Sequence, residues 1–235
     1  MNAEGIPAAA GARDIVERHE VHSMRPWQRI VYRAIRFVLE VWCRLFWRME
    51  VIGRDRLPAV GPFILAPAHR SYVDFLVTGA AVPRVMRFMA KDSLWKVAWF
   101  GRFLEHLGSF PVNRERPDRS ALRNCEEALT HGDPVVMFPE GRRKEGPVVE
   151  DLQEGPAWVA CRYRVPIVPM ALGNSDAAMP IGSKLVRPVK LRVVIGEPIY
   201  PDVPATGRVP RGKVAEVTEQ LRVEVQRCFD ESRSR

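Results

Sequence analysis

Charged residues recur every three or four positions in the segment from residue 25 to residue 48. They occupy positions 25, 29, 33, 36, 40, 44 and 48, and six of the seven are arginines. On an α-helix this spacing places the charges in one narrow stripe, with apolar and aromatic residues over the rest of the surface. The pattern therefore predicts an amphipathic helix over residues 25–48.

Two arrangements suit such a helix. In the first, the helix lies flat at the headgroup boundary of an anionic membrane, with Trp27, Trp42 and Trp47 on its apolar faces. In the second, it packs into the core of its own protein. Three tryptophans beside a stripe of arginines exceed what a core helix needs, so the pattern favours the membrane surface.

Short apolar and β-branched runs alternate with helical patterns after residue 48. The runs predict strands over 49–53, 63–66, 86–90, 110–113, 135–138, 167–172 and 190–195. The patterns between and after them predict helices over about 74–82, 92–106, 117–131, 152–163 and 210–230. This alternation is typical of an α/β fold with a mostly parallel central sheet flanked by helices. In such sheets, functional residues gather beyond the carboxyl ends of the strands.

Length and composition fit one folded domain with an appended helix. The chain has 235 residues, of which 46% are hydrophobic and 27% charged. We expect a disordered or loosely ordered N-terminus over residues 1–24 and a folded domain over residues 49–232. The net charge of +8 and the pI near 9.7 point to an anionic partner: nucleic acid, phospholipid or a phosphorylated substrate.

Cysteine usage and hydropathy bear on the location of the protein. The four cysteines are widely separated and form no CxxC pair, so we expect reduced thiols in the core of a cytosolic protein. We find no secretory signal pattern and no run of about 20 apolar residues that could cross a bilayer. Any membrane contact is therefore expected at the surface.

The stretch PAHRSYVDFL, residues 67–76, places His69 and Asp74 directly after an apolar run. Five residues apart, the two side chains would point about 140° apart on a continuous helix. If His69 instead lies in the loop after the strand, Asp74 can reach one imidazole nitrogen and leave the other for a substrate. An imidazole oriented in this way is a general base. The alternative is that both residues only cap a helix and fix a loop.

Two further segments carry cations after predicted strands. Arg114 follows the strand at 110–113, and Pro139-Glu140-Gly141 is followed by Arg142, Arg143 and Lys144. A turn glycine with convergent guanidinium groups forms a binding site for phosphate. Alternatively, the three consecutive cations belong to a solvated loop.

Taken together, these segments resemble the glycerolipid acyltransferases of the lysophosphatidate (1-acylglycerol-3-phosphate) acyltransferase type. The resemblance covers roughly residues 50–200. The family's H-x4-D block matches His69 and Asp74, and its G-x-F-x-x-x-R block matches Gly108, Phe110 and Arg114. Its F-P-E-G-T-R block is matched by Phe138, Pro139, Glu140, Gly141 and Arg143, and its V-P-I-V-P block by residues 165–169.

The resemblance implies transfer of a fatty acyl group from acyl-CoA or acyl-carrier protein to a lysophospholipid hydroxyl, with that thioester as co-substrate and no metal or other cofactor. His69 would be the base and Asp74 its orienting partner. The acceptor's phosphate and glycerol would be bound by a set of residues around them: Lys91, Arg114, Glu140, Gly141, Arg142 and Arg143. The enzyme would work as a peripheral protein at the cytoplasmic side of the cell membrane.

Three positions depart from the family pattern and bear on the acceptor. Arg142 stands where a small hydroxyl residue is usual, Lys144 where serine is frequent, and Ala68 where asparagine often precedes the histidine. The same fold could therefore acylate glycerol 3-phosphate or another lysolipid. A more remote alternative is a non-catalytic basic protein that binds nucleic acid. No recognised nucleic-acid-binding motif supports it.

Overall fold

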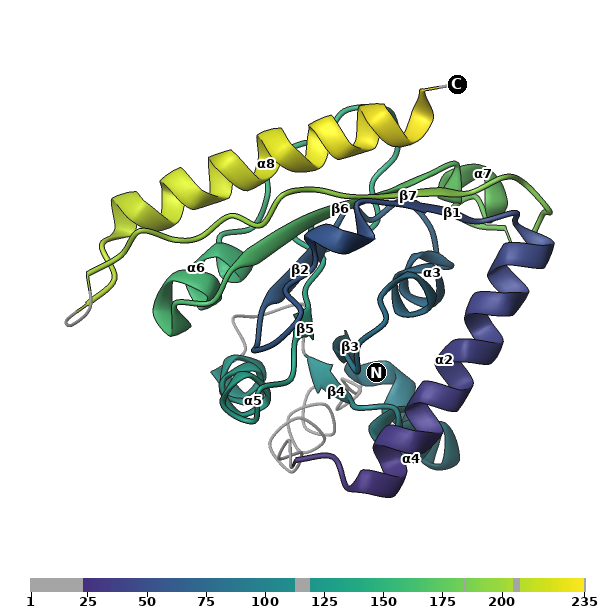
Figure 1. The fold of residues 1–235 in the computed structure, drawn as a ribbon, viewed down its shortest axis with the longest axis horizontal. Coiled ribbons are helices and arrows are strands. Elements are labelled where there is room, and N and C mark those ends of the chain that lie inside the picture. The colour runs from purple at the N-terminus through teal and green to yellow at the C-terminus, as the bar shows by residue number, and fades with distance from the viewer. Residues whose placement is uncertain (1–22, 113–118, 184, 205–207, 235) are drawn as a thin grey trace, which may run out of the picture.

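A seven-stranded sheet forms the centre of the computed structural model, which describes residues 23–112, 119–183, 185–204 and 208–234 (Figure 1). The strand order is β1–β7–β6–β2–β5–β3–β4, and every neighbouring pair is parallel except β6 with β7. This confirms the predicted α/β fold with a mostly parallel sheet. The strands are β1 (Glu50–Ile52), β2 (Ile64–Pro67), β3 (Arg87–Lys91), β4 (Ser109–Val112), β5 (Val135–Val136), β6 (Ile167–Gly173) and β7 (Arg192–Ile195).

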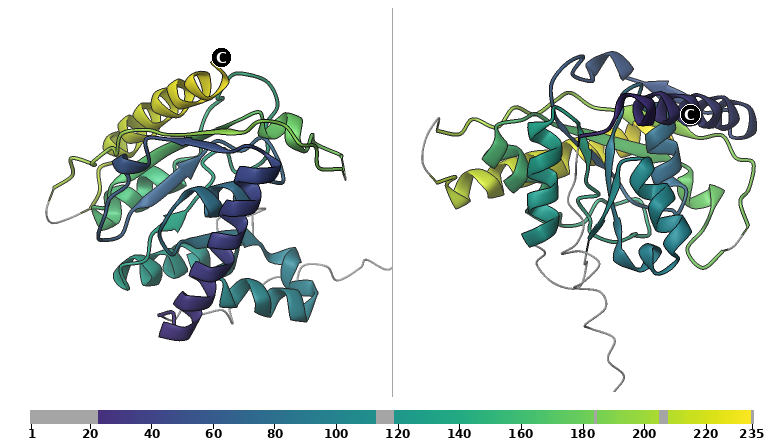
Figure 2. Two further views of the ribbon diagram at one scale, coloured as in Figure 1. Left: turned by 45° about the vertical axis from the view of Figure 1, so that its right-hand side comes forward. Right: turned by 90° about the horizontal axis from the view of Figure 1, so that it is seen from below.

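Helices cover both faces of this sheet (Figures 1 and 2). The described α-helices are α2 (Pro26–Phe46), α3 (Asp74–Ala81), α4 (Ala98–His106), α5 (Arg119–Thr130), α6 (Gly155–Tyr163), α7 (Ser175–Ala178) and α8 (Arg211–Arg233). The described residues also form two short 3₁₀ helices, η1 (Arg54–Arg56) and η2 (Asp92–Lys96).

The predicted helix over 92–106 is divided into η2 and α4. Val97 between them has an extended backbone, with φ −97° and ψ 98°. The break folds Trp95 back onto Gly101, where an added Cβ would lie 2.7 Å from the indole. The indole nitrogen donates to Glu105 at 2.8 Å. The prediction of one continuous helix over 92–106 was therefore wrong. A helical sequence pattern does not reveal the tertiary contact that breaks it.

Alternate residues of the strands point into two separate hydrophobic clusters. Ile64 and Ala66 of β2 pack with α5, α6 and α8, whereas Leu65 packs with α2 and α3. The molecule is therefore a three-layer sandwich of helices, sheet and helices. All four cysteines are free and buried within these clusters, as predicted.

Helix α2 lies on the same face of the sheet as α3 and turns part of its charged stripe toward the protein. Glu40 is buried and pairs with Arg36 at 2.6 Å, Arg44 at 2.7 Å and Arg54 at 3.0 Å. Arg29 pairs with Asp133 at 2.8 Å. The pairs of Glu40 with Arg54 and of Arg29 with Asp133 attach the helix to the body of the protein.

The outward side of α2 is apolar. Trp47, just after the helix, is fully buried, and its indole donates to the Arg187 carbonyl at 3.0 Å, so placing it at a membrane was wrong. Other large apolar residues of α2 are exposed: Trp27, Ile30, Val31, Phe37, Val38, Val41, Trp42 and Leu45. Within the described part of the chain, no helix has both the length and the apolar character needed to span a bilayer.

Candidate active site

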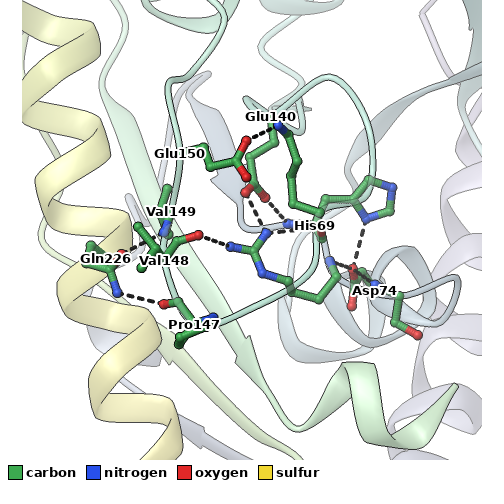
Figure 3. A network of polar contacts seen from close by, with 11 residues as sticks. His69, Asp74, Glu140, Pro147, Val148, Val149, Glu150 and Gln226 are labelled. Atoms are coloured by element: carbon green, nitrogen blue, oxygen red, sulfur yellow. Dashed lines mark hydrogen bonds and ion pairs between the residues drawn. The ribbon is translucent and has the colours of Figure 1, made fainter. Parts of the chain in front are cut away.

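His69 and Asp74 lie together where β2 leads into α3. His69 follows the strand by two residues, and Asp74 is the first residue of the helix. The imidazole Nδ1 and Asp74 Oδ2 are 2.8 Å apart, with the carboxylate fully buried (Figure 3). A carboxylate only accepts hydrogen bonds, so Nδ1 carries the hydrogen and Nε2 is the basic nitrogen. This is the orientation that a general base needs.

The same carboxylate oxygen also fixes the loop between strand and helix. The backbone N–H groups of Arg70 and Ser71 donate to Asp74 Oδ2 at 2.6 and 2.7 Å. The carboxylate therefore closes the turn that carries His69 and holds the imidazole at the same time. The loop-fixing contacts are therefore present, and the same arrangement also orients the imidazole as a general base requires.

A cavity of about 540 Å³ opens beside His69. This volume is in the range typical of sites for small organic ligands. The Phe138 ring packs against the imidazole, with the ring centroids 4.2 Å apart. Apolar residues from α2, α3, β3, η2 and α4 form most of the wall: Ile35, Leu39, Phe75, Leu76, Phe88, Met89, Leu94, Phe100, Leu104 and Leu107. The cavity suits a long apolar group whose reactive end lies near His69.

Two of the predicted cations line this cavity. Arg143 lies over the Tyr72 ring, with its guanidinium carbon 3.3 Å from the ring centroid, and Lys91 stands at the end of β3. The Arg143 Nη1 atom is buried and has no hydrogen-bond partner among the described residues. Arg142 is exposed and does not line the cavity. Arg114 lies outside the described residues.

Glu140 and Gly141 belong to the turn behind His69. Glu140 is buried, and its Oε2 accepts the backbone N–H of His69 at 2.6 Å. Gly141 has a φ of 68°, which favours glycine, and its N–H donates to the Phe138 carbonyl at 3.1 Å. Sequence reasoning did not single out Arg70 or Tyr72, although both lie inside the H-x4-D block.

Comparison with known proteins identifies the family of the chain. Residues 48–173, more than half of the chain, match the acyltransferase family. The chain is 30% identical over 171 residues to the 1-acyl-sn-glycerol-3-phosphate acyltransferase of Bacillus subtilis, covering 72% of this chain and 83% of that protein. It is 27% identical over 197 residues to the enzyme of that name from Pseudomonas aeruginosa, covering 79% and 74%.

Two further matches have slightly lower identity. The chain spans half the length of a chloroplastic 1-acyl-sn-glycerol-3-phosphate acyltransferase of Brassica napus, at 26% identity and 70% coverage of this chain. The crystal structure of the 1-acyl-sn-glycerophosphate acyltransferase PlsC from Thermotoga maritima has the same fold, with a TM-score of 0.68 and 24% identity. That alignment covers 88% of this chain and 82% of that one. On the family match and the relative from Bacillus subtilis, the chain belongs to the acyltransferase family.

Proposed function

We propose that this chain transfers a fatty acyl group from a thioester, acyl-CoA or acyl-carrier protein, to the free hydroxyl of 1-acylglycerol 3-phosphate, giving phosphatidate. The observation that carries the proposal is the His69–Asp74 pair, 2.8 Å apart, on the wall of an apolar cavity that Arg143 also lines. A base, a site for an acyl chain and a cation for phosphate are the three parts that this reaction requires.

In the proposed mechanism, His69 Nε2 takes the proton of the acceptor hydroxyl as its oxygen attacks the thioester carbonyl. Asp74 holds the imidazole in the required tautomer and stabilises the imidazolium that forms. The tetrahedral intermediate then collapses, the carbon–sulfur bond breaks, and the proton passes from His69 to the leaving thiolate. The products are an ester and a free thiol.

The acceptor phosphate is proposed to bind at Arg143 and Lys91, with Arg114 as a further ligand. Stacking on Tyr72 fixes the plane of the Arg143 guanidinium and leaves its in-plane N–H groups for an anion. Its buried Nη1 has no partner among the described residues, which supports a role in binding an anionic ligand.

The acceptor and long-chain donors partition into bilayers, so the enzyme is proposed to work as a peripheral protein at the cytoplasmic side of the cell membrane. The exposed apolar stripe of α2 supports this location. A second exposed group is formed by Leu94 of η2, Trp99 and Phe103 of α4, and Val97 between the two helices. Both helices help to line the same cavity as α2. Acyl chains could enter the cavity from such a surface without crossing water.

An acceptor panel tests the function. The purified protein is given palmitoyl-CoA with 1-acylglycerol 3-phosphate, glycerol 3-phosphate or a lysophosphatidylcholine in detergent, and products are identified by mass spectrometry. Phosphatidate is expected to form fastest. His69→Ala should lower the rate by a factor of about 10² or more with an unchanged melting temperature. Comparable turnover by this folded variant would contradict the mechanism, and a faster reaction on another acceptor would replace the proposed substrate.

A further inference from the structure

Arg70, the residue directly after His69, is a buried cation whose side chain points away from solvent. Its exposed fraction is 2%. The Nη1 atom donates to Glu140 Oε1 at 2.5 Å and to the His69 carbonyl at 3.2 Å, and Nη2 donates to the Val148 carbonyl at 3.2 Å. The guanidinium also lies 4.9 Å above the Phe229 ring of α8. Arg70 thus joins the loop that carries His69 to two other parts of the chain.

Glu140 uses both carboxylate oxygens in this cluster. Oε1 accepts from Arg70, and Oε2 accepts from the backbone N–H of His69. The side chain has no exposed area, and Glu140 does not line the cavity that contains His69. The contact with the acceptor's glycerol that the family resemblance implied would require breaking a buried ion pair.

The Val148 carbonyl that accepts from Arg70 belongs to a segment, residues 147–149, that is hydrogen-bonded to Gln226 of α8 (Figure 3). The Gln226 amide oxygen accepts the Val149 N–H at 2.7 Å, and its nitrogen donates to the Pro147 carbonyl at 3.1 Å. The backbone around Val148 is therefore held by α8 while its carbonyl accepts from Arg70. A continuous set of hydrogen bonds runs from α8 to the backbone of the proposed base.

We propose that Arg70 and Glu140 are positioning residues, which set the backbone of His69 and do not touch either substrate. This inference rests on the proposed acyl transfer and concerns how the base is held. The physical reason is that a general base works only within a narrow range of distance and angle from the proton it removes. The buried pair of Arg70 and Glu140 ties the loop that carries His69 both to α8 and to the turn at Glu140. Neutral side chains at these two positions would leave that loop with fewer fixed contacts.

Three variants separate positioning from substrate binding: Arg70→Met, Glu140→Gln and the two combined. Arg70→Met leaves a buried carboxylate without its cation, and Glu140→Gln leaves a buried cation without its carboxylate. In the double variant no charge remains buried, the amide oxygen of the introduced glutamine can still accept the His69 N–H, and methionine fills the space over Phe229. The measurements are kcat, the KM for the acceptor and the melting temperature.

Each single variant is expected to lower kcat by a factor of about 10 to 100 while the acceptor KM stays within about threefold. The double variant should regain stability relative to Arg70→Met, because no unpaired charge is buried, while its kcat stays below wild type because the contacts of Arg70 with the His69 and Val148 carbonyls are still absent. A matched control is the buried pair of Arg87 and Asp133, 2.9 Å apart at the other end of the strands. Arg87→Met with Asp133→Asn should lower the melting temperature and leave kcat near wild type.

Two results would overturn the inference. In the first, Glu140→Gln and the double variant both retain kcat, while their KM for the acceptor rises by more than about tenfold. Glu140 would then bind the acceptor directly. The other is a wild-type kcat in folded Arg70→Met. If Arg70→Met does not fold, Arg70→Lys and the double variant decide by the same two parameters. All variants are compared with the wild type on its best acceptor, so failure of the proposed substrate remains a separate result.

Discussion

One oxygen atom, Oδ2 of Asp74, accepts three hydrogen bonds, from the His69 ring and from two backbone N–H groups. Removing the charge affects the loop and the imidazole together, so Asp74→Asn cannot report on catalysis alone. The buried position of the carboxylate makes each lost bond costly. Kinetic loss in such a variant must therefore be read beside its melting temperature.

Arg143 and Arg142 form a matched pair of neighbouring cations with different surroundings. Arg143 lines the cavity over Tyr72, whereas Arg142 is exposed. A charge-assisted hydrogen bond to phosphate contributes about 1.5 to 3 kcal/mol. Arg143→Gln should therefore raise the KM for 1-acylglycerol 3-phosphate by a factor of about 10 or more and leave the KM for the acyl donor unchanged.

Arg142→Thr, at the position where the family usually has a hydroxyl residue, is the control for net charge. We expect it to leave the ranking of acceptors unchanged. Steady-state kinetics with each substrate varied in turn distinguishes the two variants. An equal rise in donor and acceptor KM for Arg143→Gln would contradict the assignment, and a changed ranking for Arg142→Thr would extend the phosphate site to that residue.

The position of His69 and Asp74 after a predicted strand made them candidates, but a helix cap explained the isolated pair equally well. Only the resemblance of four segments together to the acyltransferase family favoured a catalytic role. Arg70 was not singled out. An arginine after a strand is usually solvated, and only the fold brings Glu140, Val148 and Phe229 around it from distant parts of the sequence. Buried ion pairs of this kind depend on tertiary structure and leave no local pattern.

Among the elements, the strands were the most predictable, because each is a short apolar run bounded by turns. Helix α2 was predicted with nearly its observed bounds, but the direction of its charged stripe was not predictable from periodicity. Glu40 faces inward because it pairs with Arg54, fourteen residues later in the chain. Arg29 faces inward because it pairs with Asp133. A periodic pattern shows that a stripe exists, and its partners decide which way it faces.

The cavity between α2, α3 and α4 predicts a dependence on acyl chain length. Gly79 of α3 lines it, and a Cβ at this position would meet the Phe88 ring at 3.6 Å, an ordinary contact. Gly79→Leu should place a branched side chain in the cavity and lower turnover of palmitoyl-CoA by a factor of about 10 or more relative to octanoyl-CoA.

Gly79→Ala is the control, because it changes the helix propensity in the same direction with little added volume. The measurement is a competition assay in which the two thioesters are mixed and the products are separated by mass spectrometry. An unchanged product ratio for folded Gly79→Leu would mean that the acyl chain does not occupy this cavity.

At the scale of the whole molecule, the two sides of the sheet differ in what they expose. The side with α2 and α4, two of the helices that line the cavity, carries exposed apolar residues, including Leu45 and Trp99 at 77% and 72% exposed. The opposite side is covered by α5, α6 and α8. Deleting residues 1–48 would remove Cys43 and Trp47 from the core, so substitutions on the exposed stripe are the better test of membrane binding.

The variant with Phe37→Ser, Val38→Ser and Leu45→Ser removes exposed apolar area and no core contact. We expect it to bind anionic vesicles of phosphatidylglycerol and phosphatidylethanolamine more weakly than the wild type and to lose activity on vesicle-borne acceptor far more than on detergent-dispersed acceptor. Trp158→Ser with Val223→Ser, on α6 and α8, is the control on the other side and should bind as the wild type does.

Salt separates the two contributions to this binding. Exposed arginines near an anionic surface contribute about 1 kcal/mol each, and screening removes this share as ionic strength rises. Inserted apolar side chains are not screened, so the intact protein should be released only in part by high salt. The triple serine variant should be released at lower salt and to a greater extent. Vesicle flotation at increasing salt measures both. A triple variant that floats with vesicles as the wild type does at every salt concentration and retains full activity on them would place the membrane-facing surface elsewhere on the molecule.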